Sequence, residues 1–246
     1  MTRAAGAMAA LVVLLGGCAS PSEGSIGSAV PGATVFAASS LTTAFTEIAD
    51  GTEVSFSFDG SAGLLDQIAG GAPADVFASA DRPTMDKAVE HGLVDGHPTM
   101  FATNTLVLVT PPDNPADVTG LDSSLDGAKL VICAPAVPCG GATHRLAEAL
   151  DASLAPVSEE TSVTDVLGKV TSGEADAGLV YHTDAVGAGD RVHTVGLPGA
   201  ETDPNTYWIA AVERGDTASA RAFIELVTGE DGQAILREDG FGAPSA

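Results

Sequence analysis

The chain has 246 residues, of which 45% are hydrophobic, and its formal net charge at pH 7 is −23. Only 10 residues are lysine or arginine against 33 acidic ones, so the basic clusters that bind phosphate backbones are lacking and nucleic acid is excluded as a partner. The length beyond the N-terminal stretch suffices for one large domain or two modest ones, each with a core.

The N-terminal stretch has the pattern of a secretory signal. Residues 1–17 combine an early basic residue, Arg3, with an apolar run over residues 8–15 that is too short to span a bilayer as a mature helix. The run ends in LGGC at Cys18, which resembles a lipobox with a lipidated cysteine; the alternative is an ordinary signal peptide and a chance cysteine. Residues 18–32 are rich in Ser, Gly, Ala and Pro, and predict a flexible tether. The mature protein is therefore expected outside the cytoplasm, held to the outer face of the cytoplasmic membrane by Cys18.

The first predicted strand, residues 35–38, runs directly into two hydroxyl side chains, Ser39 and Ser40. A helix is expected next, because apolar residues recur at the spacing of one buried helical face. The first turn of a helix has unpaired N–H groups and the positive end of the dipole, so this turn is a candidate anion site. The alternative is that Ser40 only caps the helix.

A second strand, predicted over residues 54–58, delivers another hydroxyl to a helix start. The turn DGSAG at residues 59–63 contains Ser61 between glycines, which allow a ligand to approach the backbone closely. A third strand is predicted over residues 74–79, and Pro83 in the first turn of the helix that follows is a typical start signal.

Strands and helices continue to alternate to the C-terminus, which predicts parallel sheets covered by helices on both faces. Further strands are expected at residues 105–110, 129–133, 176–181 and 207–212, with the last helices at 221–228 and 231–238. Proline-rich stretches near residues 111 and 204 indicate crossings between domains. The predicted fold is α/β and two-lobed, of the periplasmic-binding-protein type II kind, with two crossover strands and a ligand cleft between the lobes. Residues 33–110 and 205–246 are assigned to lobe 1, and residues 111–204 to lobe 2.

Two cysteines remain after Cys18, namely Cys133 and Cys139. Outside the cytoplasm such a pair is most simply a disulfide, here closing a short loop. A metal pair would need further ligands at a suitable spacing, and a redox pair is more usually C-x-x-C.

The sequence does not match the enzyme motifs that its turns and histidines bring into question. The turn at Ser61 lacks the first glycine of G-x-S-x-G, and the five histidines show no metal-ligand spacing. The GAG at residues 187–189 is not a dinucleotide fingerprint. The residues predict a binding protein, not an enzyme, with no cofactor.

Three stretches resemble the molybdate-binding proteins of ABC transporters, the ModA family. They are VFAASSLT at residues 35–42, GAPADVFASAD at residues 71–81 and LVYHTDA at residues 179–185. The likeness extends from about residue 34 to the C-terminus. It implies a receptor that captures molybdate, and by similarity of size tungstate, for an ABC permease in the membrane.

The resemblance also implies which groups hold the oxyanion: serine hydroxyls, main-chain amides and one tyrosine hydroxyl. The corresponding positions are Ser39, Ser40, Ser61, Cys139, Val163 and Tyr181. These residues would hold the molybdenum through its oxygen atoms, so no separate metal site is expected. Two departures stand out: Gly60 and Ala62 flank Ser61 where relatives often have serines, and Cys139 replaces the usual small residue.

All of these ligands are neutral donors, which suit a tetrahedral dianion without a proton better than phosphate, which carries one near neutral pH. A monomer is expected. Two alternatives remain: the same fold binding sulfate, phosphate or a small organic anion, and an envelope lipoprotein that has lost ligand binding.

Overall fold

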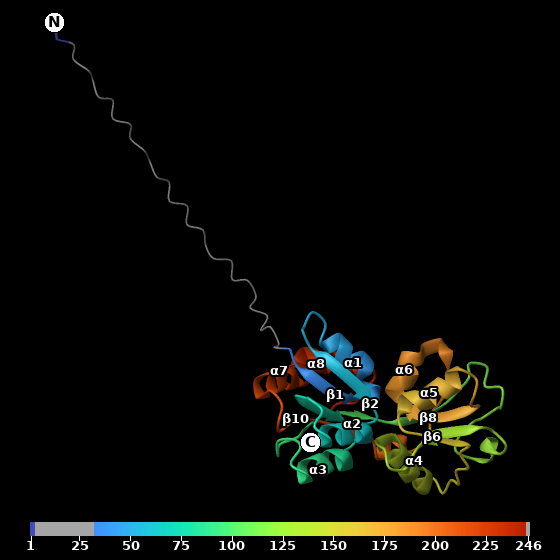
Figure 1. Ribbon diagram of the computed structural model, residues 1–246. Helices are drawn as coiled ribbons and strands as arrows, with labels where there is room; N and C mark the ends of the chain where they lie inside the picture. Colours follow the sequence, from blue (N-terminus) through green and yellow to red (C-terminus); the bar gives the residue numbers. More distant parts are fainter. Residues whose placement is uncertain (3–31, 245–246) are drawn as a thin grey trace.

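The computed structural model describes residues 1–2 and 32–244, which form two α/β lobes side by side (Figure 1). The predicted signal, the tether and Cys18 lie outside the described residues, so those predictions remain untested. Each lobe contains one five-stranded sheet, in the orders β2-β1-β3-β10-β4 and β7-β6-β8-β5-β9. The predicted two-lobed α/β fold is confirmed.

The first lobe is built on a sheet buried on both faces. Its strands are β1 (Thr34–Ala38), β2 (Ser55–Asp59), β3 (Val76–Ser79), β4 (Thr99–Asn104) and β10 (Asn205–Ala211). Its helices are the 3-10 turn η1 (Ser39–Leu41), α1 (Thr42–Ile48), α2 (Ser61–Ala69), α3 (Arg82–Glu90), α7 (Thr217–Thr228) and α8 (Glu230–Glu238). Successive residues of a strand point to opposite faces, so Val35 packs in one apolar cluster with Phe45 while Phe36 packs in the other with Leu64.

The second lobe repeats the design with fewer α-helices. Its strands are β5 (Leu106–Thr110), β6 (Leu130–Cys133), β7 (Ser158–Glu160), β8 (Ala177–Tyr181) and β9 (His193–Val195). Its helices are η2 (Ser123–Leu125), α4 (Pro138–Ala149), α5 (Val163–Thr171), α6 (His182–Ala188) and η3 (Gly189–Arg191), and η4 (Ala200–Thr202) precedes the return to the first lobe.

The sheets are mixed, which corrects the expectation of purely parallel ones. Strand β10 runs antiparallel to β3 and β4, and β5 runs antiparallel to β8 and β9. The reason is topological: β5 and β10 are reached directly from the other lobe, so no helix crossover turns the chain round before they pair.

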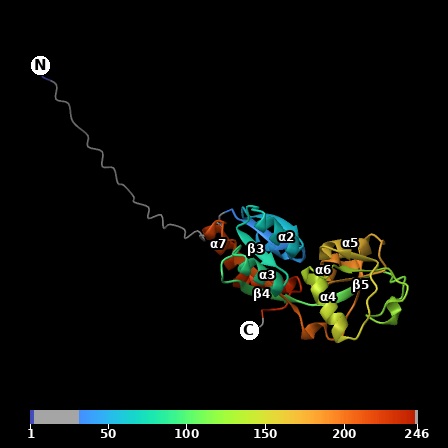
Figure 2. The same cartoon turned by 60° about the horizontal axis from the view of Figure 1, so that its bottom comes forward.

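The first crossing between lobes lies at Asn104–Thr105, between β4 and β5 (Figure 2). The assignment of residues 33–110 to lobe 1 is therefore wrong for residues 106–110, because β5 pairs with β8 and β9 in the second sheet. The proline run after Thr110 ends β5 inside the second lobe and does not mark the crossing. The chain returns at Asn205, where β10 begins.

Within the described residues, no helix has both the length and the apolar character needed to cross a membrane. The same residues contain no group of three or more His, Cys, Asp or Glu side chains arranged to hold a metal ion.

Candidate ligand-binding site

The strand ends that carry the predicted site residues converge on one cavity between the lobes. It takes lining residues from both lobes. All six predicted ligand residues line it: Ser39, Ser40, Ser61, Cys139, Val163 and Tyr181. They come together because the carboxyl ends of β1, β2, β6 and β8 face the gap between the sheets, as expected for open α/β sheets.

The first lobe contributes serine hydroxyls. Ser40 follows β1 in η1, and its Oγ lies 2.9 Å from the hydroxyl oxygen of Tyr207. Ser61 begins α2 and is 1% exposed, and its Oγ accepts a hydrogen bond of 3.1 Å from the main-chain N–H of Ala80. Both hydroxyls are therefore held in place from behind, inside the first lobe.

The second lobe contributes the first turns of two helices. Cys139 is the second residue of α4, directly after Pro138, and Val163 is the first residue of α5. Amides at these positions have no partner within their own helix and lie at the positive end of its dipole. Ser162 caps α5 by accepting a 3.2 Å hydrogen bond from the N–H of Asp165.

The predicted disulfide is confirmed: Cys133 and Cys139 are joined by an S–S bond of 2.05 Å. The bond ties the end of β6 to the first turn of α4, and so fixes the loop that positions the Cys139 amide. Gly140 follows in the same turn, and a Cβ there would lie only 1.8 Å from the carbonyl oxygen of Ala134. The first turn of α4 is thus packed tightly onto its own entry loop, and only glycine fits at position 140.

Tyr181 ends β8 and is 1% exposed. Its hydroxyl oxygen accepts a 2.5 Å hydrogen bond from the side-chain amide of Asn205. Burial raises the pKa of Tyr181 well above its usual range, so the phenol is neutral. Asp184 accepts a 3.0 Å hydrogen bond from the N–H of Tyr181, and burial raises the pKa of this carboxyl to about 7.

Three residues that support the site were not predicted from the sequence: Asn104, Asn205 and Tyr207. Asn104 ends β4 and Asn205 begins β10, and they are paired across the sheet at the point where the chain crosses between lobes. Asn205 also donates to the carbonyl oxygen of Ala80 at 3.1 Å, so it contacts both lobes. The sequence signal for Asn104 and Asn205 was a polar residue directly at each crossing between the lobes. It was missed because the first crossing was predicted six residues after its actual position.

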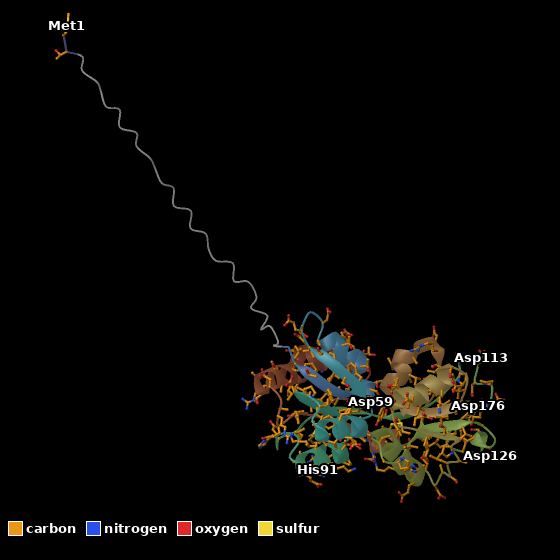
Figure 3. The ribbon with its side chains drawn as sticks, viewed as in Figure 1. Met1, Asp59, His91, Asp113, Asp126 and Asp176 are labelled. Carbon is orange, nitrogen blue, oxygen red and sulfur yellow. A yellow bond between two sulfur atoms is a disulfide. The ribbon has the colours of Figure 1, made fainter. Side chains whose placement is uncertain are left out.

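The groups that could stabilise an anion in the cavity are dipoles and not cations. Among its lining residues, all of them in the described part of the chain, none is lysine or arginine. One is acidic: Asp59, whose Oδ1 accepts a 2.7 Å hydrogen bond from the N–H of Gly60. Figure 3 shows Asp59 where the first lobe meets the second, whereas Asp126 and Asp176 lie toward the outer side of the second lobe.

The lobes touch beside the cavity. A Cβ built on Gly60 would lie 2.2 Å from the carbonyl oxygen of Thr161 in the second lobe, so no larger residue fits while this contact exists. At another point of the interface, a Cβ on Gly240 would lie 3.2 Å from the imidazole of His182. The structure therefore shows the lobes closed around the cavity.

Two α/β lobes joined by two crossing strands, and closed over a small cavity of neutral donors, define an extracytoplasmic solute-binding protein. The sequence profile of the family described as bacterial extracellular solute-binding protein matches residues 27–242. The molybdate-binding protein ModA of Mycobacterium tuberculosis is 47% identical over 219 residues, covering 85% of this chain and 84% of its own. ModA of Escherichia coli is 34% identical over 254 residues, covering 95% of each chain. The chain therefore belongs to the bacterial extracellular solute-binding protein family and, within it, to the ModA group.

The solved structures agree with this on the fold. The periplasmic molybdate-binding protein of Azotobacter vinelandii superposes with a TM-score of 0.73 at 23% identity, covering 87% of this chain and 100% of its own. Proteins of this family bind and deliver solutes and are not enzymes.

Proposed function

We propose that this protein captures molybdate between its lobes and delivers it to an ABC importer. The observation that carries the proposal is the convergence of the Ser40, Ser61 and Tyr181 hydroxyls with the helix starts at Cys139 and Val163 on one cavity without a cation. Such a set donates hydrogen bonds in several directions, as a tetrahedral dianion requires. Relatives 47% and 34% identical to this chain are named molybdate-binding proteins.

Neutral donors are sufficient for tight binding. Hydrogen bonds to a charged group contribute roughly 1.5–3 kcal/mol each. About six of them supply on the order of 9–18 kcal/mol before the costs of association are subtracted. Micromolar to nanomolar affinity corresponds to about 8–12 kcal/mol. A lysine or arginine is therefore not required to hold the ion.

Tungstate, an oxyanion of the same shape and charge, belongs to the same proposal. The cavity recognises oxygen atoms, and the donors that surround it do not contact the central metal. Delivery to the permease would take place at the outer face of the membrane, where lipidation of Cys18 and the tether of residues 18–32 would hold a monomeric receptor close to its partner.

The test is calorimetric titration of the protein from residue 33 onward with molybdate, tungstate, sulfate and phosphate at equal ionic strength. Molybdate and tungstate are expected to bind with similar affinity, and sulfate and phosphate at least about 100-fold more weakly. Sulfate binding comparable to that of molybdate would replace the molybdate assignment with a general oxyanion receptor. No binding of any of the four would remove the proposal.

A further inference from the structure

We infer that Asn104 and Asn205, at the two crossings between the lobes, fix the direction in which the cavity hydroxyls donate and so make the cavity select oxyanions that carry no proton. The inference rests on the proposed function, because it concerns the specificity of the same cavity. A hydroxyl has one proton to donate and two lone pairs that accept. When a donor behind the hydroxyl occupies a lone pair, the proton is left for the ligand.

Ser61 shows the principle in its shortest form. The main-chain N–H of Ala80 donates to Ser61 Oγ at 3.1 Å. A main-chain N–H can only donate, so the direction of this hydrogen bond is certain. The Ser61 proton is therefore free to point into the cavity that the residue lines.

Tyr181 is oriented through Asn205. The guanidinium of Arg145 donates to Asn205 Oδ1 at 2.9 Å, and Asn205 Nδ2 donates to the carbonyl oxygen of Ala80 at 3.1 Å. Because a guanidinium only donates and a carbonyl only accepts, both ends of the Asn205 amide are assigned. The 2.5 Å contact between Asn205 Nδ2 and the Tyr181 hydroxyl is consequently a hydrogen bond accepted by the tyrosine. The proton of Tyr181 is left for the cavity.

Ser40 is oriented through Asn104 and Tyr207. The N–H of Thr105 donates to Asn104 Oδ1 at 3.0 Å, which assigns the amide. Asn104 Nδ2 then donates to Thr183 Oγ1 at 2.8 Å and to the Tyr207 hydroxyl at 3.4 Å. The Tyr207 hydroxyl accepts from the asparagine, which leaves its own proton available for Ser40 Oγ, 2.9 Å away. With Tyr207 as the donor of this pair, the Ser40 proton is left for the cavity.

Both tyrosines keep the protons that this arrangement needs. Burial raises the pKa of Tyr181 and of Tyr207 well above the usual value. The three hydroxyls therefore add donors to those of the helix amides, and each has one of its lone pairs engaged from behind.

An oxyanion that brings its own O–H group is disfavoured in such a cavity, because the hydroxyls present their protons to the ligand, and a hydroxyl that turns to accept the ligand's proton loses the hydrogen bond that it donates. Phosphate carries a proton near neutral pH, whereas molybdate carries none. The one carboxylate that lines the cavity, Asp59, has one oxygen engaged by Gly60 N–H and an exposed side chain. Asn104 and Asn205 are thus positioning residues that determine specificity without contacting the ion.

The test replaces the side-chain amide of Asn205, which donates to Tyr181, with a carboxylate. In Asn205→Asp the new side chain can only accept, so Tyr181 is expected to donate to it and to turn a lone pair toward the cavity. We expect molybdate affinity to fall by at least about 30-fold, and the ratio of molybdate affinity to phosphate affinity to fall at least about tenfold. Thr202→Asp is the matched control: it adds the same charge at an exposed position lining the pocket that contains Asn205. There, both affinities should fall equally, leaving the ratio within about twofold.

A second variant tests the contacts that lead from Asn104 through Tyr207 to Ser40, and it does so without changing the charge. Tyr207→Phe removes the donor behind Ser40, so the ratio of molybdate to phosphate affinity should fall about three- to tenfold. Thermal melting establishes that each variant is folded, and Tyr207→Phe decides the matter if Asn205→Asp does not fold. The ratios are measured from pH 6 to 8.5 and compared with the wild type at each pH, because Asp184, whose pKa is about 7, titrates in every variant and cancels in this comparison. A directional effect then follows the protonation of phosphate, and a purely structural defect does not. Unchanged ratios in the folded variants would overturn the inference while leaving molybdate binding intact. Failure of the wild type to bind molybdate would instead remove the proposed function.

Discussion

The two lobes contribute different kinds of donor to the same cavity. The first lobe offers serine side chains, Ser40 and Ser61, whose hydroxyls are held by Tyr207 and Ala80. The second lobe offers the first turns of α4 and α5, where the donors belong to the main chain, together with the Tyr181 hydroxyl.

This difference determines how each lobe tolerates substitution. A hydroxyl donor is lost when one side chain is truncated, whereas a main-chain N–H survives any replacement except one that moves the backbone or introduces proline. The second lobe accordingly protects its donors by holding the backbone: a disulfide fixes the approach to α4 and Ser162 caps α5. Substitutions separate these two modes of construction, beginning with the contact on which both depend.

The largest effect is expected where the lobes meet. In Gly60→Ala the Cβ would lie 2.2 Å from the carbonyl oxygen of Thr161 when the lobes are closed. The backbone of Gly60, at φ −61 and ψ 134, suits alanine, so the open protein should fold normally. We expect molybdate affinity, measured by calorimetry, to fall at least about 100-fold because closure is blocked.

The matched control for that variant is Gly63→Ala in the same segment. A Cβ at residue 63 would meet only Asp59 Oδ2, at an ordinary 3.6 Å. Its affinity should stay within about twofold of the wild type, and its melting temperature should not fall, because alanine favours helix over glycine. If Gly60→Ala bound molybdate nearly as well as Gly63→Ala, the contact with Thr161 would play no part in closure.

The next effect separates the lobes directly. Ser61→Ala removes a buried donor from the first lobe and should weaken molybdate binding about 10- to 100-fold. Ser162→Ala in the second lobe removes a cavity-lining hydroxyl whose two hydrogen bonds both go to Asp165 in the cap of α5. Its stability should therefore fall by about 1 kcal/mol while its affinity falls less than about fivefold. Calorimetry measures the molybdate affinity of both variants, and urea denaturation measures their free energy of unfolding. Equal losses of affinity would show that the lobes do not differ in this respect.

A smaller effect is expected from opening the disulfide. The Cys133→Ala, Cys139→Ala double variant keeps the main-chain N–H at residue 139, so molybdate affinity should fall only about three- to fivefold. The two cysteines are six residues apart, and loss of so short a loop should reduce stability by about 2 kcal/mol. Thiol alkylation with and without reductant verifies the bond in the wild type. A loss of affinity beyond about 30-fold would mean that the sulfur atoms themselves serve the ligand.

The smallest effect concerns the carboxylate at the rim. Asp59→Asn preserves the acceptor for Gly60 N–H and removes a negative charge beside an anion site. The side chain is exposed, so screening limits the repulsion, and affinity for molybdate should rise about two- to threefold at low salt and less at high salt. Titration at two ionic strengths measures this. A loss of affinity would assign Asp59 a supporting function in the site.

Local signals in the sequence predicted much of this molecule correctly. Pro83 lies in the first turn of α3, which Asp81 caps, and Ser162 caps α5 directly after its strand. Each of these features depends on side chains within four residues of one another. Ser40, Ser61, Cys139 and Tyr181 were likewise expected at strand ends, because parallel strands bring their carboxyl ends to one edge of the sheet. Val163 was expected only from the resemblance to the ModA family.

Other features were missed for lack of a local signal. Strand β4 (Thr99–Asn104) does not alternate between polar and apolar residues, so it was not predicted, and the crossing was consequently placed after β5. Strands β7 and β9 are only three residues long. The direction of β5 and β10 depends on the lobe from which each one arrives, which no residue within the strand records.

By itself, the sequence determined the alternation of strands and helices, the disulfide partners and the hydroxyls at the ends of strands, because each follows from short-range pattern. Only the tertiary structure decided which groups stand behind those residues. Ser40 meets Tyr207 across 167 positions of sequence, and Tyr181 meets Asn205 across 24. Whether a hydroxyl donates to a ligand or accepts from it depends on such distant partners, since the hydroxyl can do either and its surroundings in the folded chain select one.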